Sequence, residues 1–494
     1  MESGPPHLSP VPGTEAIPHH HPHPGVPGMP MPPQMMPMTT PVGLQAIYQA
    51  CRRLYADQPN PLQVTAVVKY WLGGPDPLDY ISMYSNPGDP NRGIPAHWHY
   101  VSFGLSDLYG DGRVHEYTGP EGPSGFGFEL TIRLKKETGE TAPPTWPAAL
   151  MQTLARYVFQ SGEESNQNVL CAGDHVSWHN ALDSSESRIQ HMLMAEDPLL
   201  QSILSPMGTI NFIQIIGVTA EELQAAQRWN GPGILELLRN VPVAGGPWLL
   251  TDMRRGETIF EKDPQLQEVV ERGIETEGSN LSGVSAKCSW EEMEESREER
   301  EESEETVRQR ITPHESEQIK AELRRGLMGQ HGSGAAGFGT GAGADLTDHV
   351  NHNTDRERKD SLSSSGSTEE VKPGELQRSQ TMDAVHVKIN KEAGTLLPLV
   401  MRGRLKHGRH FTFKDVSGNS AITFVSPRVM GAIADESHPY ASRGPWLQVL
   451  IPEDFLEAVI KDLEELSNTE ELEVPKQYRW REKGLTISVL PDDW

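Results

Sequence analysis

Cysteine is scarce in this chain of 494 residues, which contains only Cys51, Cys171 and Cys288. The three are far apart and form no CxxC pair, so neither a disulfide framework nor a zinc finger is expected. Long hydrophobic runs are missing too. None approaches the roughly 20 residues that cross a bilayer, and the first residues do not have the charge and apolar pattern of a signal peptide. We therefore expect a soluble protein with reduced thiols, located in the cytosol or nucleus.

Positive charge is also in short supply. The chain has 43 Lys and Arg residues against 69 Asp and Glu residues, for a formal net charge of −26. A field of that sign repels phosphate backbones and anionic lipids, so direct binding to nucleic acid or to a membrane is not expected and a basic partner is favoured. The stretch 402–410 is the one candidate anion site, and its alternative interpretation is a set of solvated strand ends.

Two segments lack the large apolar side chains that would offset the entropy of ordering them. Residues 1–43 are rich in Pro, His and Met, and about 291–382 combine an acidic run with Gly- and Ser-rich stretches. Both are predicted to be disordered. Within the second, Thr312 and Glu315 have the spacing of a capping box, with Pro between them, which predicts a short helix over 313–328.

The flanking segments have the periodicities of helices and strands. Helices are predicted over 44–55, 147–159, 219–229 and 233–241, with strands over 64–72, 80–84, 98–105 and 126–134. Later strands are predicted over 385–389, 395–401, 421–426, 446–451 and 485–490, with a helix over 455–466. The fold class is therefore α+β, with two mixed α/β lobes (44–282 and 283–494) that contain largely antiparallel sheets and are joined by a hinge.

Two histidine-containing motifs suggest chemistry. His97 and His99 alternate along a predicted strand and so share one face, as two metal ligands would, but no third ligand is evident. The segment from Asp174 to His179 contains the residue types of a catalytic triad, although neighbours on a strand face opposite ways. A metal- or triad-dependent hydrolase using His97, His99 and Asp174 is the competing functional interpretation, against ordinary hydrogen-bonded histidines.

Four long runs closely resemble the Suppressor of fused family: 62–80, 102–110, 278–288 and 405–412. The resemblance covers both predicted lobes. It implies a non-enzymatic negative regulator of Hedgehog signalling, which binds and sequesters Gli/Ci transcription factors in the cytoplasm and restrains them in the nucleus. Members of the family hold a short Ser-Tyr-Gly-His-Leu segment of the factor as an added β-strand between the two lobes. Backbone hydrogen bonds then supply affinity and side-chain pockets supply specificity.

The resemblance also assigns peptide contacts. Tyr157 and Asp174 match the pair that receives the ligand histidine, where an ionised carboxylate would accept the ring N–H and favour its protonated form. Val284 and Ala286 match positions at the start of the second lobe, and Glu392 and Leu396 match groove positions on a strand of that lobe. From the sequence alone, Val284, Ala286 and Leu396 would pass for core residues.

The resemblance implies no cofactor and no metal. Besides the Gli/Ci zinc-finger factors, the expected partners are a Fused-type kinase and other proteins of the Hedgehog pathway. Ser361 follows Arg358, Lys359 and Asp360, a layout that basophilic kinases favour, and it matches a family phosphorylation position. The family's neighbouring upstream phosphoserine position is occupied here by Glu357, which argues against tandem phosphorylation.

Overall fold

A computed structural model describes residues 40–162, 170–293, 379–468 and 472–494. None of the helices in these ranges is long and apolar enough to span a bilayer. Cys51, Cys171 and Cys288 are all unpaired, as their spacing predicted.

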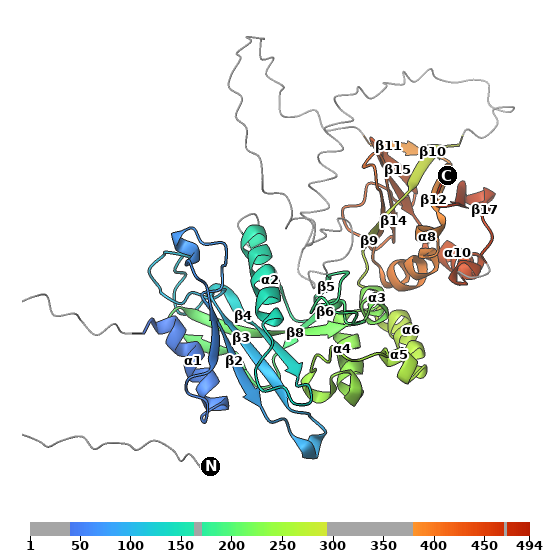
Figure 1. Cartoon of the computed structure of the whole chain (residues 1–494). Helices are drawn as coiled ribbons and strands as arrows, with labels where there is room; N and C mark the ends of the chain where they lie inside the picture. Colours follow the sequence, from blue (N-terminus) through green and yellow to red (C-terminus); the bar gives the residue numbers. More distant parts are fainter. Residues whose placement is uncertain (1–39, 163–169, 294–378, 469–471) are drawn as a thin grey trace, which may run out of the picture. The chain divides into compact units, whose positions relative to one another are not determined.

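The first half of the described chain contains an eight-stranded sheet with the strand order β1-β2-β3-β4-β8-β6-β5, to which β7 adds on β8 (Figure 1). Its neighbours run antiparallel except for β4 and β8, which are parallel. Strands β1 and β5 therefore lie at the two edges. The strands are β1 Leu62–Thr65, β2 Tyr80–Asn86, β3 His97–Phe103, β4 Pro123–Lys135, β5 His175–Ser177, β6 His191–Glu196, β7 Ile203–Ser205 and β8 Gly208–Val218.

Two helices cover opposite faces of this sheet (Figure 1). Side chains along a strand alternate between its faces, and β3 follows this rule. Val101 and Phe103 pack in the hydrophobic cluster that contains helix α1 (Val42–Leu54), whereas Tyr100 packs in the cluster that contains helix α2 (Trp146–Gly162). The sheet is thus buried on both sides, and the α2 side carries the larger cluster.

A group of helices follows β8. Helix α3 begins with a capping box, in which the Thr219 hydroxyl accepts the Glu222 N–H and the Glu222 carboxylate accepts the Thr219 N–H. Trp229 at the end of α3 lies directly against Gly273, where any side chain would collide with the indole. The helices are α3 Ala220–Arg228, α4 Gly231–Asn240, α5 Ile259–Lys262 and α6 Gln265–Glu277.

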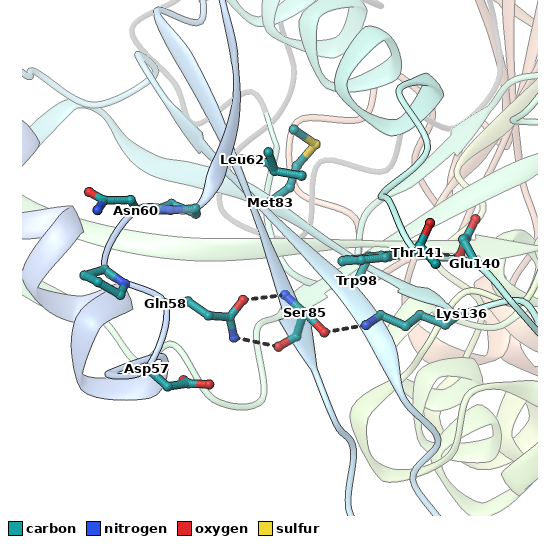
Figure 2. Close-up of a pocket in the computed structure, with 12 residues that line it drawn as sticks. Asp57, Gln58, Asn60, Leu62, Met83, Ser85, Trp98, Lys136, Glu140 and Thr141 are labelled. Carbon is teal, nitrogen blue, oxygen red and sulfur yellow. Dashed lines mark hydrogen bonds between the residues drawn. The ribbon is translucent and has the colours of Figure 1, made fainter. Parts of the chain in front are cut away.

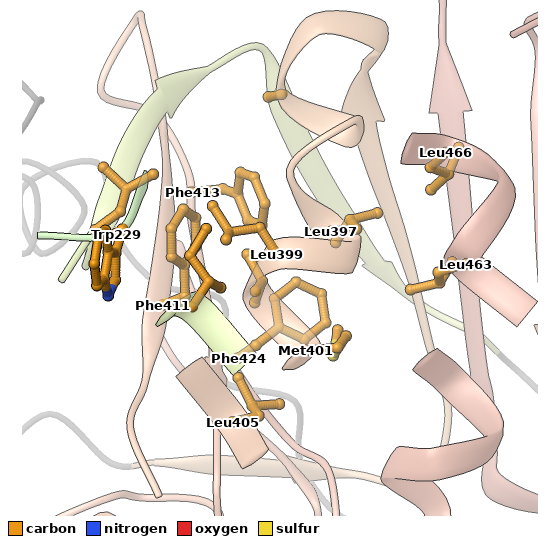
Figure 3. Close-up of a cluster of buried hydrophobic side chains, with 14 of the residues drawn as sticks. Trp229, Leu397, Leu399, Met401, Leu405, Phe411, Phe413, Phe424, Leu463 and Leu466 are labelled. Carbon is orange, nitrogen blue, oxygen red and sulfur yellow. The ribbon is translucent and has the colours of Figure 1, made fainter. Parts of the chain in front are cut away.

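The second half contains a six-stranded sheet, β11-β15-β16-β14-β13-β9, and a four-stranded sheet, β10-β12-β18-β17. One hydrophobic cluster joins both sheets and their helices, with aromatic side chains at its centre, among them Phe411, Phe413 and Phe424 (Figure 3). The strands are β9 Gly283–Ala286, β10 Cys288–Glu292, β11 Gln380–Met382, β12 Val385–Asn390, β13 Phe411–Asp415, β14 Ala421–Val425, β15 Tyr440–Arg443, β16 Trp446–Leu450, β17 Lys476–Trp480 and β18 Leu485–Leu490. The helices are α8 Lys391–Gly394, α9 Leu397–Leu399 and α10 Glu453–Leu463.

The mixed α/β architecture with mostly antiparallel sheets confirms the predicted fold class, but two predicted strands are wrong. The strand expected over 64–72 ends at Thr65, and Tyr70–Leu72 form a 3-10 turn that Gly73 closes with a φ of 85°. The strand expected over 395–401 is helical, because α8, α9 and the π-turn Val400–Arg404 follow one another there. A short buried apolar run does not distinguish strand from helix by its pattern.

The ends of the predicted disordered segments also need correction. Glu291 and Glu292 belong to β10, and Gln380–Met382 form β11, so ordered strands occupy both margins of the segment 291–382. Helix α1 begins at Val42, within the predicted tail of 1–43. The predicted helix 313–328, the phosphorylation candidate Ser361 and residues 1–39 of the tail lie outside the described residues.

Candidate peptide-binding site

Strand β5 is an edge strand with a buried carboxylate directly before it. It pairs with β6 alone among the described strands, so the backbone on its other side joins no strand ladder within the described chain. Gly173 has a φ of 97°, which few residues other than glycine adopt, and its turn delivers Asp174 to the start of the strand. The Met194 N–H donates to the Asp174 carbonyl at 2.8 Å, which fixes the position of this residue against β6.

The Asp174 carboxylate is fully buried, and only one of its two oxygens has a hydrogen-bond partner within the described chain. Its Oδ2 accepts the Cys171 N–H at 2.7 Å, whereas its Oδ1 has no hydrogen-bond partner within the described chain. Burial raises the pKa of Asp174 to about 7, against the lowering effect of the Cys171 N–H. The buried environment of the free protein thus disfavours the ionised form of this carboxyl, which the predicted contact with a ligand histidine requires.

Tyr157 lies on α2, whose side chains share a cluster with β5. Val158 of the helix and Val176 of the strand both belong to this cluster. Alternation along the strand places Asp174 on the same face as Val176, which is the face that α2 covers. Tyr157 is half-buried, and burial raises the pKa of its hydroxyl. The helix that carries Tyr157 and the strand that Asp174 precedes thus pack in one cluster on the same face of the sheet.

Strand β9 is the corresponding edge of the six-stranded sheet. It pairs in parallel with β13 only, within the described residues. The Thr412 N–H donates to the Ser282 carbonyl and the Val416 N–H to the Ala286 carbonyl, so every second residue of β9 directs its backbone toward β13. By the same alternation, the backbone groups of the exposed Ser285 point away from β13. Sequence reasoning did not find this edge.

The four predicted contacts in the second lobe gather around β9. Val284 is half-buried and Ala286 buried in the hydrophobic cluster, and helix α8, which carries Glu392, packs beside β9. Leu396 follows α8 in a helical turn and packs against the same cluster. Glu392 and Leu396 lie on helical backbone rather than on the predicted strand.

His97 and His99 belong to a buried network on the other face of the first sheet. His99 is bonded to the Tyr55 hydroxyl at 2.8 Å and to Asp197 at 3.0 Å, while His97 is bonded to the Arg133 guanidinium at 3.0 Å and to the Pro95 carbonyl. Burial lowers the pKa of His97 to about 3 and that of His99 to about 4, so both are neutral. All four ring nitrogens have protein partners, and the described residues contain no cluster of three or more metal-ligand side chains.

The basic stretch 402–410 is occupied by the protein itself. Arg404 and Arg409 donate to the Ser279 carbonyl at 2.7 and 2.8 Å, and His407 is bonded to the Glu275 carbonyl. These carbonyls lie at the end of α6 and just beyond it, where a helix accumulates negative partial charge. The side chains therefore fix the connection from α6 to β9, in place of the anion site proposed for them.

A cavity of about 500 Å³ lies at the β1 edge of the first sheet (Figure 2). Leu62, Met83 and Trp98 line it, and the Gln58 amide makes two hydrogen bonds to the Ser85 backbone, in the manner of a further strand residue. None of the predicted peptide contacts lines this cavity.

Two family models match this chain, one over most of the first sheet and the other over the two sheets of the second half. Residues 74–256 match the family model described as Suppressor of fused protein, and residues 268–489 match the model described as Suppressor of Fused Gli/Ci N terminal binding domain. Together these define a chain of two family-specific domains.

The relatives extend the match over nearly the full length. The chain is 60% identical over 454 residues to the Suppressor of fused homolog of Mus musculus and 59% identical to that of Homo sapiens, covering 91% of this chain and 92% of each relative. The crystal structure of Drosophila Suppressor of Fused superposes with a TM-score of 0.69 at 35% identity, over 93% of this chain and 99% of that one. The chain belongs to the Suppressor of fused family, which confirms the resemblance found in the sequence.

Proposed function

We propose that this protein is a non-enzymatic negative regulator of Hedgehog signalling that binds Gli/Ci transcription factors and sequesters them in the cytoplasm and nucleus. It holds a Ser-Tyr-Gly-His-Leu segment of the factor as a β-strand added to the open edges of β5 and β9. The model that matches residues 268–489 carries Gli/Ci binding in its description, and this range includes Val284, Ala286, Glu392 and Leu396.

The observation that carries this proposal is the Oδ1 of Asp174, which has no hydrogen-bond partner among the residues that the structure describes. A buried acceptor without a donor costs about 1–3 kcal/mol, and more if it is charged. An imidazole N–H of the ligand satisfies this acceptor, and the imidazolium form adds a charge-assisted bond. The position suits a histidine in an added strand, because Asp174 directly precedes β5 at the open edge.

The two edges supply the backbone half of the recognition. Strand addition uses the N–H and C=O groups of an edge strand, and the backbone of Ser285 on β9 is turned to such an open side. Val284 and Leu396, both half-buried, offer partly exposed apolar surface to a ligand side chain. Backbone pairing would then contribute affinity for any extended peptide, and Asp174 would select the one with a histidine.

The test is a calorimetric titration of a longer peptide that contains the five-residue motif, with its histidine replaced by alanine as the control ligand. Asp174→Ala is expected to weaken binding by about 2–5 kcal/mol, the effect of truncating one side of a buried charged hydrogen bond. Asp57→Ala is the matched control, since Asp57 is exposed in the same lobe. Equal affinity of the wild type and Asp174→Ala would refute this mode of binding.

A further inference from the structure

The C-terminal residues Pro491–Trp494 make specific contacts beside the candidate site. After β18 ends at Leu490, the Asp492 carboxylate turns toward helix α8. Its Oδ1 accepts the Glu392 N–H at 2.9 Å and the Asn390 side-chain N–H at 2.8 Å. These two bonds, with the charge of Lys391, lower the pKa of Asp492, so the carboxylate is charged at neutral pH.

Asp492 replaces a cap that Asn390 cannot supply. Asn390 is the N-cap residue of α8, but its side chain makes no capping bond there. Its Oδ1 instead accepts the Lys287 N–H at 3.1 Å, and its own N–H donates to the Lys287 carbonyl at 3.0 Å. Asn390 is thereby committed to the residue that directly follows β9, and Asp492 holds the start of α8 from 100 residues away.

Trp494 also lies close to Lys287, the residue that Asn390 binds. The Lys287 ammonium lies 5.5 Å from the centre of the Trp494 ring, and the indole is 37% exposed. A cation at that distance from an indole is attracted to its face. The terminal segment therefore touches Lys287, directly after β9, and Glu392 on α8; these two elements carry three of the four candidate contacts of the second lobe, and Leu396 follows α8.

We propose that Pro491–Trp494 position the peptide-binding site: through Asp492, this segment aligns Glu392 with the open edge of β9. The inference rests on the proposed function and extends it to residues beyond the range of the matched family model, which ends at residue 489. Strand addition to an edge of only four residues gains affinity when that edge is already ordered, because less entropy is lost on binding. Asp492 is a positioning residue and need not touch the peptide.

The experiment compares three variants of the full-length chain. Asp492→Ala removes the acceptor and is expected to weaken binding of the motif peptide about fivefold. Asp492→Asn keeps an oxygen acceptor and should bind within about twofold of the wild type. Asp493→Ala changes the same charge at the next position, where no hydrogen bond or ion pair is present within the described chain, and should leave affinity unchanged. Asp492→Asn and Asp493→Ala should keep the melting temperature of the wild type, whereas Asp492→Ala removes a helix cap and should lower it slightly.

Hydrogen exchange separates this inference from the proposed function. Asp492→Ala should speed exchange in the segments 283–289 and 390–396, with or without peptide. If the wild type does not bind the peptide, the proposed function fails, and faster exchange still supports the positioning role. Unchanged hydrogen exchange in these two segments would overturn the positioning role of Asp492. So would an affinity loss that the Asn variant does not restore.

Discussion

Replacing Asp174 by asparagine should stabilise the free protein at alkaline pH while it weakens peptide binding. In the folded protein, burial raises the pKa of this carboxyl from 3.8 to about 7. A rise of this size corresponds to about 4 kcal/mol at about 1.36 kcal/mol per pKa unit. Because the folded state binds the proton more tightly than the unfolded state, the contribution to stability is complete below pH 4 and is lost as the pH rises through 7.

The two pH values chosen for the stability measurement both lie above the sequence pI of about 5.1. Between pH 5.5 and pH 8.5, the linkage relation gives a loss of about 2 kcal/mol for the wild type that Asp174→Asn does not show. Asparagine is neutral throughout and keeps an oxygen for the Cys171 N–H. Urea unfolding curves of both proteins at the two pH values measure this difference, with the exposed Asp57→Asn as the control.

Binding should change in the opposite direction. The asparagine cannot form the charge-assisted bond to an imidazolium, so calorimetry should show a loss of affinity for the motif peptide of about 2 kcal/mol or more. A difference in stability between wild type and variant that is the same at pH 5.5 and pH 8.5 would refute the reasoning, because it would show that the burial of Asp174 does not strain its ionised form.

Three further predictions concern the same molecule. Affinity for the motif peptide should be highest between about pH 6.5 and 7 and fall toward pH 5 and pH 9, because the complex shares one proton between Asp174 and an imidazole with a pKa of about 6.5; calorimetry across this range that finds no maximum would contradict it. Asp197→Ala should lower the free energy of unfolding by about 3–5 kcal/mol, since it leaves the fully buried Arg133 without its carboxylate; a loss below about 1 kcal/mol in urea unfolding would disprove this. Ser361→Glu should alter the separation of the lobes or the release of the partner more than it alters stability. Small-angle scattering and thermal melts test this prediction. A changed melting temperature with an unchanged scattering profile would count against it.

Long amphipathic elements could be predicted from the sequence because their own side chains determine them. Leu44, Ile47 and Cys51 recur at helical spacing, and all three are buried in the cluster under α1. Helix α10 and strand β18 were found on the same ground. In each case the local pattern and the tertiary environment agree, which is the condition under which single-sequence reasoning succeeds.

Two short strands at the candidate site could not be predicted from the sequence, whereas helix α2 could. Strand β5 has three residues and β9 has four, too few for a period to appear, and each exists because a neighbouring strand pairs with it. The run around Leu396 is short and apolar, and such a pattern does not distinguish a strand from the helical turn that the structure has there. Asp174 was noticed for its residue type, but its burial and its unpartnered oxygen depend on contacts with β6 that no local pattern encodes.

The treatment of buried carboxylates in this fold explains why Asp174 stands out as a binding group. Glu129 is fully buried and accepts hydrogen bonds from Ser102, Ser106 and the backbone between them, which ties down the turn after β3. Although burial alone would raise the pKa of Asp197, Arg133 and His99 hold it well below its usual range. Among the described residues, Asp174 has neither a cation nor a set of donors, and it lies at an edge that could accept a further strand. A buried acceptor left in this state lowers stability, and a ligand that brings its own donor recovers that free energy on binding. The missing donor for Asp174 therefore lowers the stability of the free protein and favours the complex. It favours the complex only for a peptide that has a hydrogen-bond donor at this position.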